Sequence, residues 1–382
     1  MPIIELQNVD KFFQSGGQKI KAVDDVSFEV HRGEIFTLLG PSGCGKTTTL
    51  RCIAGLEPID GGQILFSDTV VSEPNKTVPP EHREIGFMYQ SYALWPHMTV
   101  SENISFALKG RKYPKENRKE RIEDLLELAA LEGMGNRYPS ELSGGQRQRV
   151  AFMRAISYEP EVLLMDEPLS NLDLNQRQRM RKELLKVLKE RQITTVYVTH
   201  DQEEAFEISD TIIVMNEGRV VQQGTPEEIY NDPQSTFVAN FVGDVNIFDV
   251  DFLHSNDGEA FCEVKGATPA FSIRCSHNGN AIDGNLSVAV RPENITLRGI
   301  SDTGSAPDTA NTIDLGDGLQ ESEVNTYEGT VIESYYRGLF TLTMVDLNGL
   351  IIKVNTQDRE FADGDDILID ILPEHADLIA EV

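Results

Sequence analysis

Residues 40–47 read Gly40-Pro41-Ser42-Gly43-Cys44-Gly45-Lys46-Thr47, which fits the phosphate-loop pattern GxxxxGK[ST]. Residues 34–39 before it are mostly apolar and predict a buried strand, and residues 46–56 after it predict a helix. Glycines let backbone N–H groups converge on an anion at the positive end of that helix. We expect Lys46 to contact the β- and γ-phosphates of a nucleoside triphosphate, Thr47 to bind Mg²⁺, and Thr48 to contact nucleotide beside them.

Strand-like and helix-like segments alternate through the first part of the chain. Residues 162–165 and 195–198 are short, β-rich and apolar, which is typical of strands buried on both faces. Between the phosphate loop and these strands, residues 115–132 space their apolar side chains as a helix does. This alternation predicts an α/β fold with a mainly parallel sheet that helices cover on both sides.

Two acidic residues, Asp166 and Glu167, follow the predicted strand at 162–165. They are therefore expected at the carboxyl edge of the sheet, where open α/β sheets bind ligands. We expect Asp166 to hold Mg²⁺ through water and Glu167 to polarise the attacking water. Carboxylates also end strands without any function, and it is the phosphate loop in the same chain that favours the catalytic interpretation.

A second candidate anion site is the sequence Leu142-Ser143-Gly144-Gly145-Gln146, which precedes a predicted helix at 147–156. One nucleotide scarcely needs two such helix starts in one chain, whereas two chains related by a two-fold axis do. The sequence therefore predicts a homodimer in which Ser143, Gly144, Gly145 and Gln146 of one chain contact the ATP held by the other. The competing interpretation, a simple helix cap, does not require the whole five-residue string.

Composition narrows the class of protein. The 382 residues suffice for two domains, and the net charge of −28 disfavours binding to nucleic acid and to anionic lipid. No signal peptide is visible, and no apolar run approaches the ~20 residues of a spanning helix, so we expect a cytoplasmic protein.

The four cysteines lack CxxC spacing, which argues against a zinc site. Cys262 and Cys275 are expected to be reduced core thiols rather than a disulfide across neighbouring strands.

The pattern changes near residue 244. From there on, short alternating segments are separated by Gly, Asp and Asn turn signals, at residues 287–290, 329–334, 339–345, 350–354 and 366–371. They predict a compact antiparallel β domain. We place the two domains at residues 1–243 and 244–382, with a helical subdomain at residues 91–145. Residues 300–323, rich in Ser, Thr, Asp and Gly, predict a mobile loop.

In their order along the chain, the motifs resemble those of the ATP-binding-cassette ATPases, and the match covers residues 3–242. The order is the phosphate loop, Gln90 after a strand, residues 142–146, Asp166-Glu167, Ser170-Asn171-Leu172-Asp173 and His200. The resemblance implies a P-loop ATPase cassette that uses ATP and Mg²⁺. It also implies that Glu167, His200, Lys46 and Gln90 are the catalytic residues.

Individual roles follow from the same resemblance. Gln90 is expected to sense Mg²⁺ and the attacking water and to couple the site to a membrane partner. Asp173 is expected in a loop that crosses the dimer interface, and His200 is expected to contact the γ-phosphate. Phe13 resembles the aromatic residue that stacks on adenine. Packing of Phe12 or Phe13 in the core is the alternative for this position.

The second part of the chain also carries a resemblance. Residues 289–295, 328–331 and 335–338 look like the TOBE-type accessory domain of importer ATPases, which folds as small oligonucleotide/oligosaccharide-binding barrels. Arg291 as the brace of a turn is the plainer interpretation, and the 300–323 loop is longer than the usual pattern. The resemblance implies two integral-membrane permease subunits and, indirectly, an extracytoplasmic solute-binding protein. The ATPase would then lie at the cytoplasmic face of the inner membrane, bound through the permease subunits.

Residues 91–98 resemble the region that receives a short helix of the membrane subunit. Trp95 either contributes to that contact or is buried in the helical subdomain. Residues 92–100 look most like the ferric-iron and polyamine branches of the importers. We expect iron(III) as the transported solute, with polyamine and sugar as alternatives.

Two other classes compete with a transporter. Soluble cassette ATPases that act on DNA or ribosomes usually have long coiled-coil insertions or two cassettes in one chain, and neither is visible. The charge of −28 also opposes binding to nucleic acid. A regulatory ATP sensor without hydrolysis is disfavoured by the presence of both Glu167 and His200.

Overall fold

A computed structural model describes residues 1–256, 258–276, 284–300, 313–314, 320–321, 324–357 and 361–380. The chain forms two compact units, Met1–Ile229 and Tyr230–Val382. Most of the loop predicted at 300–323 lies outside the described residues. Within it, the structure describes Ile300 and two short paired strands, β17 (Ile313–Asp314) and β18 (Gln320–Glu321).

A six-stranded sheet with the order β11-β10-β3-β9-β8-β7 forms the centre of the first unit. Neighbouring strands are parallel except for β11, which pairs antiparallel with β10. Every residue of the three central strands β3, β9 and β8 is buried, as expected for strands with helices on both faces. The strands are β3 (Ile35–Leu39), β7 (Ile85–Met88), β8 (Val162–Asp166), β9 (Thr194–Thr199), β10 (Thr211–Asn216) and β11 (Arg219–Gly224).

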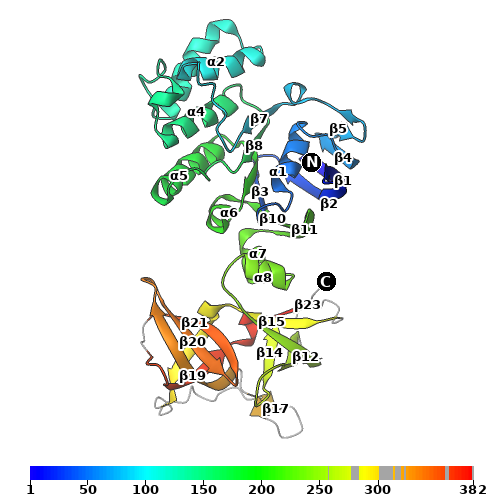
Figure 1. Ribbon diagram of the computed structural model, residues 1–382, viewed down its shortest axis with the longest axis vertical. Helices are drawn as coiled ribbons and strands as arrows, with labels where there is room; N and C mark the ends of the chain where they lie inside the picture. The colour runs from blue at the N-terminus through cyan, green and yellow to red at the C-terminus, as the bar shows by residue number, and fades with distance from the viewer. Residues whose placement is uncertain are drawn as a thin grey trace. The chain divides into compact units, whose positions relative to one another are not determined.

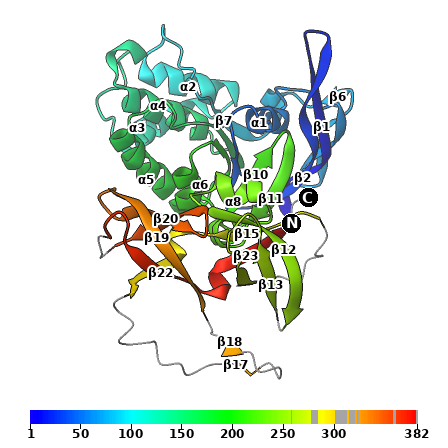
Figure 2. The ribbon, with the colours of Figure 1, turned by 60° about the horizontal axis from the view of Figure 1, so that its bottom comes forward.

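Six helices accompany this sheet, and Figures 1 and 2 show how they lie around it. Two of them begin with a capping box, in which the N-cap side chain and the third helical residue bond to each other's backbone N–H. Thr99 and Glu102 form the box of α2, and Ser143 and Gln146 form that of α4. The helices are α1 (Lys46–Ala54), α2 (Val100–Gly110), α3 (Arg118–Leu128), α4 (Gly144–Ile156), α5 (Leu174–Glu190) and α6 (Gln202–Ile208).

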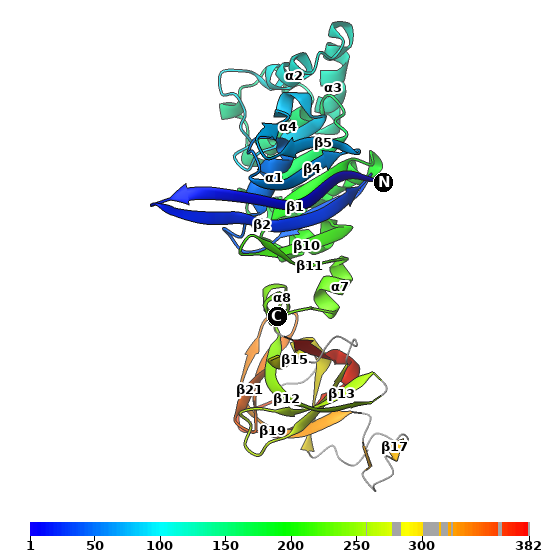
Figure 3. The same ribbon diagram turned by 90° about the vertical axis from the view of Figure 1, so that its right-hand side faces the viewer.

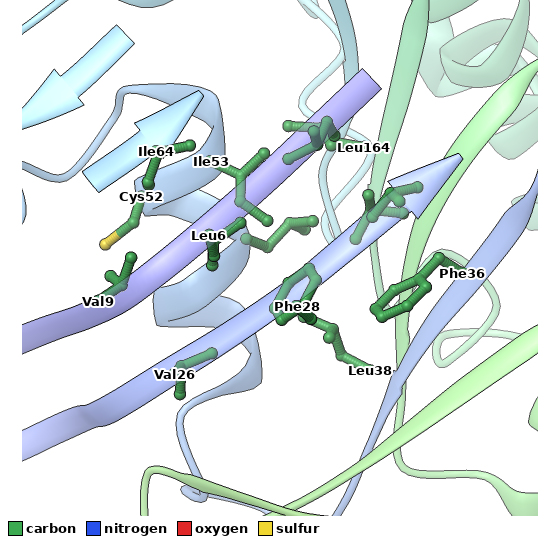
Figure 4. Packing of buried hydrophobic residues seen from close by; sticks show 14 of the residues in the cluster. Leu6, Val9, Val26, Phe28, Phe36, Leu38, Cys52, Ile53, Ile64 and Leu164 are labelled. Carbon is green, nitrogen blue, oxygen red and sulfur yellow. The ribbon is translucent and has the colours of Figure 1, made fainter. Parts of the chain in front are cut away.

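An antiparallel sheet with the order β2-β1-β4-β5-β6 completes the core of the first unit. Its two longest strands form a hairpin that projects beyond the body of the unit (Figure 3). At the base of the hairpin, Leu6, Phe28 and Phe36 pack with Ile53 of α1 (Figure 4), and the two phenylalanine rings stack with centroids 4.9 Å apart. This core fixes α1 and the phosphate loop before it. The strands are β1 (Pro2–Ser15), β2 (Gln18–His31), β4 (Gly61–Phe66), β5 (Thr69–Glu73) and β6 (Lys76–Thr77).

The second unit is built from β-strands, as the alternating segments predicted. A closed barrel has the order β12-β13-β14-β23-β15, and a five-stranded sheet has the order β16-β22-β19-β20-β21. Buried side chains of both form one hydrophobic core. The strands are β12 (Asn246–Asn256), β13 (Glu259–Val264), β14 (Ser272–Ser276), β15 (Leu286–Val290), β16 (Ile295–Gly299), β19 (Asn325–Tyr336), β20 (Thr341–Leu347), β21 (Leu350–Thr356), β22 (Asp366–Ile371) and β23 (Ala376–Ala380).

Two short helices, α7 (Pro226–Asn231) and α8 (Thr236–Phe241), occupy the region of the domain boundary. The boundary expected at 243/244 lies after α8, whereas the second compact unit already begins at Tyr230. The buried Arg291 is one contact that ties this region to the second unit, because its guanidinium donates hydrogen bonds to the carbonyl oxygens of Ala239, Asp244 and Tyr230 at 2.9, 3.2 and 3.1 Å. Arg291 therefore braces distant backbone of the second unit rather than a turn of its own, which its plainer interpretation proposed.

The cysteine pair of the second unit lies inside the barrel. Cys262 on β13 and Cys275 on β14 are both fully buried, and their Sγ atoms are 4.0 Å apart. Both are free thiols, as expected. All four cysteines of the chain are free and buried.

Candidate active site

The phosphate loop joins β3 to α1 at the carboxyl edge of the parallel sheet. Gly45 has φ of +107°, and a Cβ there would lie 2.3 Å from the carbonyl oxygen of Ala22. A Cβ at Gly40 would lie equally close to the carbonyl oxygen of Met215. No side chain caps α1, so its first N–H groups remain available to an anion. The same loop and first helical turn contain Pro41, Ser42, Gly43, Cys44 and Thr48.

Lys46 is held beneath this loop with only 4% of its surface exposed. Its Nζ donates hydrogen bonds to the carbonyl oxygens of Gly40 at 2.6 Å and Pro41 at 2.8 Å. Within the part of the chain that the structure describes, no carboxylate lies within ion-pair distance of this ammonium group. Its charge is therefore available to an anion bound in the loop.

Thr47 and Asp166 meet beside the loop. The Thr47 hydroxyl donates to Asp166 Oδ1 at 2.7 Å, and Asp166 ends β8 with 4% of its surface exposed. Burial raises the pKa of this carboxyl above its ordinary value, and the hydrogen bond from Thr47 opposes the shift. Hydroxyl and carboxylate oxygens are ligands that suit Mg²⁺. The pair thus fits the predicted metal site.

Glu167 lies between Gln90 and His200. Its Oε2 accepts a hydrogen bond from Gln90 Nε2 at 3.0 Å, and its Oε1 is 3.2 Å from His200 Nδ1. The three residues follow β7, β8 and β9, which are neighbours in the sheet. Glu167 has φ of +42°, a left-handed conformation that residues other than glycine seldom adopt and that is concentrated at functional sites. The arrangement places a carboxylate, an amide and an imidazole together.

Ser170 and Asn171, which the sequence identified only as members of a motif, hold this group in place. Ser170 Oγ lies 3.4 Å from Gln90 Nε2 and donates to the Glu167 carbonyl oxygen at 3.0 Å. Asn171 Nδ2 donates to the Gln90 carbonyl oxygen at 2.7 Å. These bonds tie the loop after β7 to the loop after β8. Sequence reasoning missed the contacts because they depend on strands that are neighbours in space but not in sequence.

The second candidate anion site lies apart from the phosphate loop in the same chain. Ser143 caps α4, its side chain accepting from Gln146 N, and a Cβ at Gly144 would contact Leu172 at 3.7 Å. Asp173 likewise caps α5, accepting from Gln176 N at 2.9 Å. Among the described residues, no hydrogen bond or ion pair joins residues 143–146 to residues 40–48.

Sequence similarity to known proteins identifies the family. Residues 23–170 match the family model "ABC transporter", and residues 288–379 match "TOBE domain". The Fe(3+) ions import ATP-binding protein FbpC of Brucella abortus (strain 2308) is 43% identical over 326 residues, which cover 85% of this chain and 88% of the relative. This chain belongs to the ABC transporter ATPases. It is the ATP-binding and ATP-hydrolysing subunit of an importer.

Other ABC relatives differ in how much of the chain they match. The spermidine/putrescine import ATP-binding protein PotA of Clostridioides difficile (strain 630) is 39% identical over 97% of this chain and 96% of its own length. The trehalose/maltose import ATP-binding protein MalK of Thermococcus litoralis is 52% identical over 63% of this chain and 65% of its own length. The dimeric structure of the bacterial ABC transporter cassette MJ0796 matches with a TM-score of 0.53 and 32% identity, covering 58% of this chain and 98% of that one.

An apolar groove of about 520 Å³ lies on the first unit of this ABC ATPase. Trp95 and Phe106 line it with ring centroids 4.4 Å apart, and 48% of Phe106 is exposed. The Arg154 guanidinium lies 4.9 Å from the centroid of the Trp95 ring and donates to the carbonyl oxygens of Tyr92 and Ala93 at 2.8 and 2.6 Å. Trp95 is therefore half-buried at the groove rather than hidden in the helical subdomain.

Phe13 lies on β1 of the cassette with 39% of its surface exposed, so its alternative interpretation as a core residue is wrong. Lys11 Nζ is 5.2 Å from the centroid of the Phe13 ring. Phe12 is half-buried, with Lys19 Nζ 3.5 Å from its ring centroid. Stacking of adenine on Phe13 stays a prediction.

A helix that crosses a bilayer must be both long enough and apolar enough to span its hydrocarbon core. In the described ranges, no helix meets both requirements for crossing a membrane.

Proposed function

We propose that this importer ATPase acts as a homodimer, using the group around Glu167 for hydrolysis and driving two permease subunits. The observation that carries the proposal is the position of the Glu167 carboxylate. It lies 3.0 Å from the Gln90 amide and 3.2 Å from the His200 imidazole, at the end of the strand that also supplies Asp166. Acid, amide and imidazole at the edge of a phosphate loop suit in-line attack of water on a γ-phosphate.

Each residue of the site then has one task. Lys46 and the N–H groups at the start of α1 bind the β- and γ-phosphates and stabilise charge that develops on them. Glu167 orients and polarises the attacking water, and His200 contacts the γ-phosphate. Thr47, Asp166 and Gln90 would hold a Mg²⁺ ion, which neutralises phosphate charge when it is bound.

The homodimer completes each site. In our proposal Ser143, Gly144, Gly145 and Gln146 of one chain contact the ATP in the phosphate loop of the other, and Asp173 crosses the same interface. Two observations support this. Residues 143–146 make no polar contact with the phosphate loop of their own chain within the described residues, and a cassette with 32% identity is dimeric.

The groove at Trp95 is the proposed binding site for a short helix of a permease subunit. Its half-buried Trp95 and exposed Phe106 form an apolar surface of the kind that anchors protein interfaces. The Arg154 hydrogen bonds fix residues 92 and 93, both of which have positive φ, and so present Trp95 in one orientation. Bound in this way, the ATPase would lie at the cytoplasmic face of the membrane.

Trp95→Ala is expected to weaken assembly with the permease subunits by about 2 kcal/mol, roughly 30-fold in affinity, because the side chain is an interfacial anchor. The basal ATPase rate of the isolated subunit should change less than twofold. Tyr336→Ala, which removes an aromatic residue that is 78% exposed on the second unit, is the control and should not affect assembly. Co-purification and transport-coupled ATPase activity measure both variants. Unchanged assembly in Trp95→Ala would exclude this groove as the binding site.

We propose iron(III) as the transported solute. Support comes from the ferric-ion importer ATPases, which are 43% identical over 85% of the chain. A polyamine is the second candidate, because the spermidine/putrescine relative matches 97% of the chain. The sugar relative is 52% identical but matches only 63% of the chain. A sugar is therefore the third candidate solute.

The experiment on the solute uses the native complex with its solute-binding protein in lipid vesicles. ATPase activity is measured with iron(III), spermidine or maltose added at equal concentration. The expected result is stimulation of several-fold by iron(III) alone. Stimulation by spermidine or maltose alone would instead assign that solute, and the role of Glu167 in hydrolysis would be unaffected by this outcome.

A further inference from the structure

Arg177 contacts the loops on either side of the proposed active site. It belongs to the first turn of α5, four residues after Asp173. Its Nη1 donates to Asp201 Oδ2 at 2.9 Å, and its Nη2 donates to the carbonyl oxygen of Leu172 at 3.4 Å. Leu172 precedes Asp173, and Asp201 follows His200. One guanidinium group thus joins the loop that holds Asp173 to the loop that holds His200.

The loop of His200 is anchored on both sides of the histidine. Asp201 N donates to Thr199 Oγ1 at 3.0 Å, and Asp201 Oδ1 accepts from Glu204 N at 3.0 Å as the N-cap of α6. Thr199 Oγ1 in turn donates to Glu204 Oε2 at 2.8 Å. Thr199 and Asp201 flank His200, and hydrogen bonds fix both of them. A shift of Asp201 would therefore move the backbone of His200 and, with it, the imidazole.

A buried carboxylate connects Arg177 to the same anchor. Glu204 is only 3% exposed, and its Oε1 lies 3.9 Å from Arg177 Nε. Arg177 Nε is itself buried and has no hydrogen-bond partner in the part of the chain described by the structure. An unpaired buried donor of a charged group is costly, so the guanidinium is placed to bond Asp201 and Leu172 rather than to optimise its pairing with Glu204.

We propose that Arg177 is a positioning residue that couples the Asp173 loop to the His200 loop. This inference rests on the proposed function, in which Asp173 crosses the dimer interface and His200 contacts the γ-phosphate. When the partner chain's nucleotide contacts Asp173, a shift of that loop moves Arg177. Arg177 then moves Asp201, and Asp201 moves the adjacent His200. Each chain thereby adjusts its own histidine to the state of the neighbouring site.

Two variants break the link from opposite sides. Arg177→Gln removes the guanidinium. Asp201→Asn keeps a good N-cap for α6 but replaces the oxygen that accepts from Arg177 Nη1. Each is expected to lower kcat about tenfold, the usual effect of losing a hydrogen bond to a charged group, while KM for ATP changes less than twofold. The double variant should lose no more than either single variant, because both break the same link.

Arg177→Lys separates positioning from charge neutralisation. A lysine still neutralises Glu204, but its single ammonium lacks the planar fork that reaches Asp201 and Leu172 together. We expect its kcat to stay about tenfold low. Full rescue by lysine, or additive losses in the double variant, would show that Arg177 only compensates the buried acid and would overturn the proposal.

Arg179→Gln is the matched control, because Arg179 lies on the same helix, is 77% exposed and pairs with Glu183. Its kcat should be unchanged. His200→Ala separates the two proposals. If it is inactive while Arg177→Gln and Asp201→Asn have wild-type kcat, only the coupling role is overturned; if His200→Ala is fully active, the role of His200 and the coupling both fail. Should Arg177→Gln not fold, the kcat of Asp201→Asn alone decides.

Discussion

Replacing Glu167 with glutamine is expected to lower the rate of ATP hydrolysis about a thousandfold, the usual contribution of a general base. The amide has nearly the size of the carboxylate, so its contacts with Gln90 and His200 are largely kept. It cannot accept a proton from water, and the bound ATP therefore persists. In the proposed homodimer ATP joins the two chains, so the dimer should accumulate. Steady-state phosphate release and size-exclusion chromatography with ATP and Mg²⁺ measure the two effects.

Glu161→Gln is the matched control for this variant. Glu161 directly precedes the same strand, β8, at the end opposite Glu167. Its carboxylate is 46% exposed and lies 3.8 Å from an Arg32 nitrogen, a surface pair that contributes little to stability. This variant should hydrolyse ATP at the wild-type rate. A rate near wild type in Glu167→Gln would instead remove Glu167 from the catalytic role.

The phosphate site was predictable because its chemistry is local. The glycines, Lys46 and Thr47 are contiguous, and an apolar strand and a helix flank them. The convergence of Gln90, Glu167 and His200 is different, because it depends on β7, β8 and β9 being neighbours in the sheet. Only the order of motifs in a resembling family indicated it. The left-handed backbone at Glu167 has no signal in the sequence, since glutamate seldom adopts it.

The division into two units depends on contacts that the local sequence pattern does not show. Residues 230–243 read as a continuation of the helical first part, and α8 is indeed a helix. Contacts with residues far along the chain join α8 to the second unit: Ala239 packs with Ala289, and its carbonyl oxygen accepts a hydrogen bond from Arg291, more than fifty residues later. Arg177 was missed for the same reason. Its position on α5 resembles any solvent-facing arginine until the loop of Asp201 is placed beside it.

A mixture of Ser143→Arg chains and Lys46→Ala chains is expected to regain nucleotide trapping that neither variant shows alone. In a dimer of the two, one shared site has both defects. The other combines the intact Lys46 of one chain with the intact Ser143 of its partner. Ser143 is exposed, so an arginine there blocks the nucleotide without disturbing a core, at a cost of about 1 kcal/mol for the lost helix cap.

Heterodimers isolated through two different affinity tags should trap about half as much ATP per dimer as the wild type, because one of two symmetric sites is complete. The amount of trapped ATP is a better readout than steady-state turnover, because it counts complete sites even if the two sites of a dimer hydrolyse ATP in alternation. The two homodimers serve as controls and should trap none. If each chain instead completed its own site, every site in the mixture would carry a defect, and heterodimers would trap no more than the homodimers. That result would refute the shared site, because the proposal requires Lys46 of one chain to act together with Ser143 of the other.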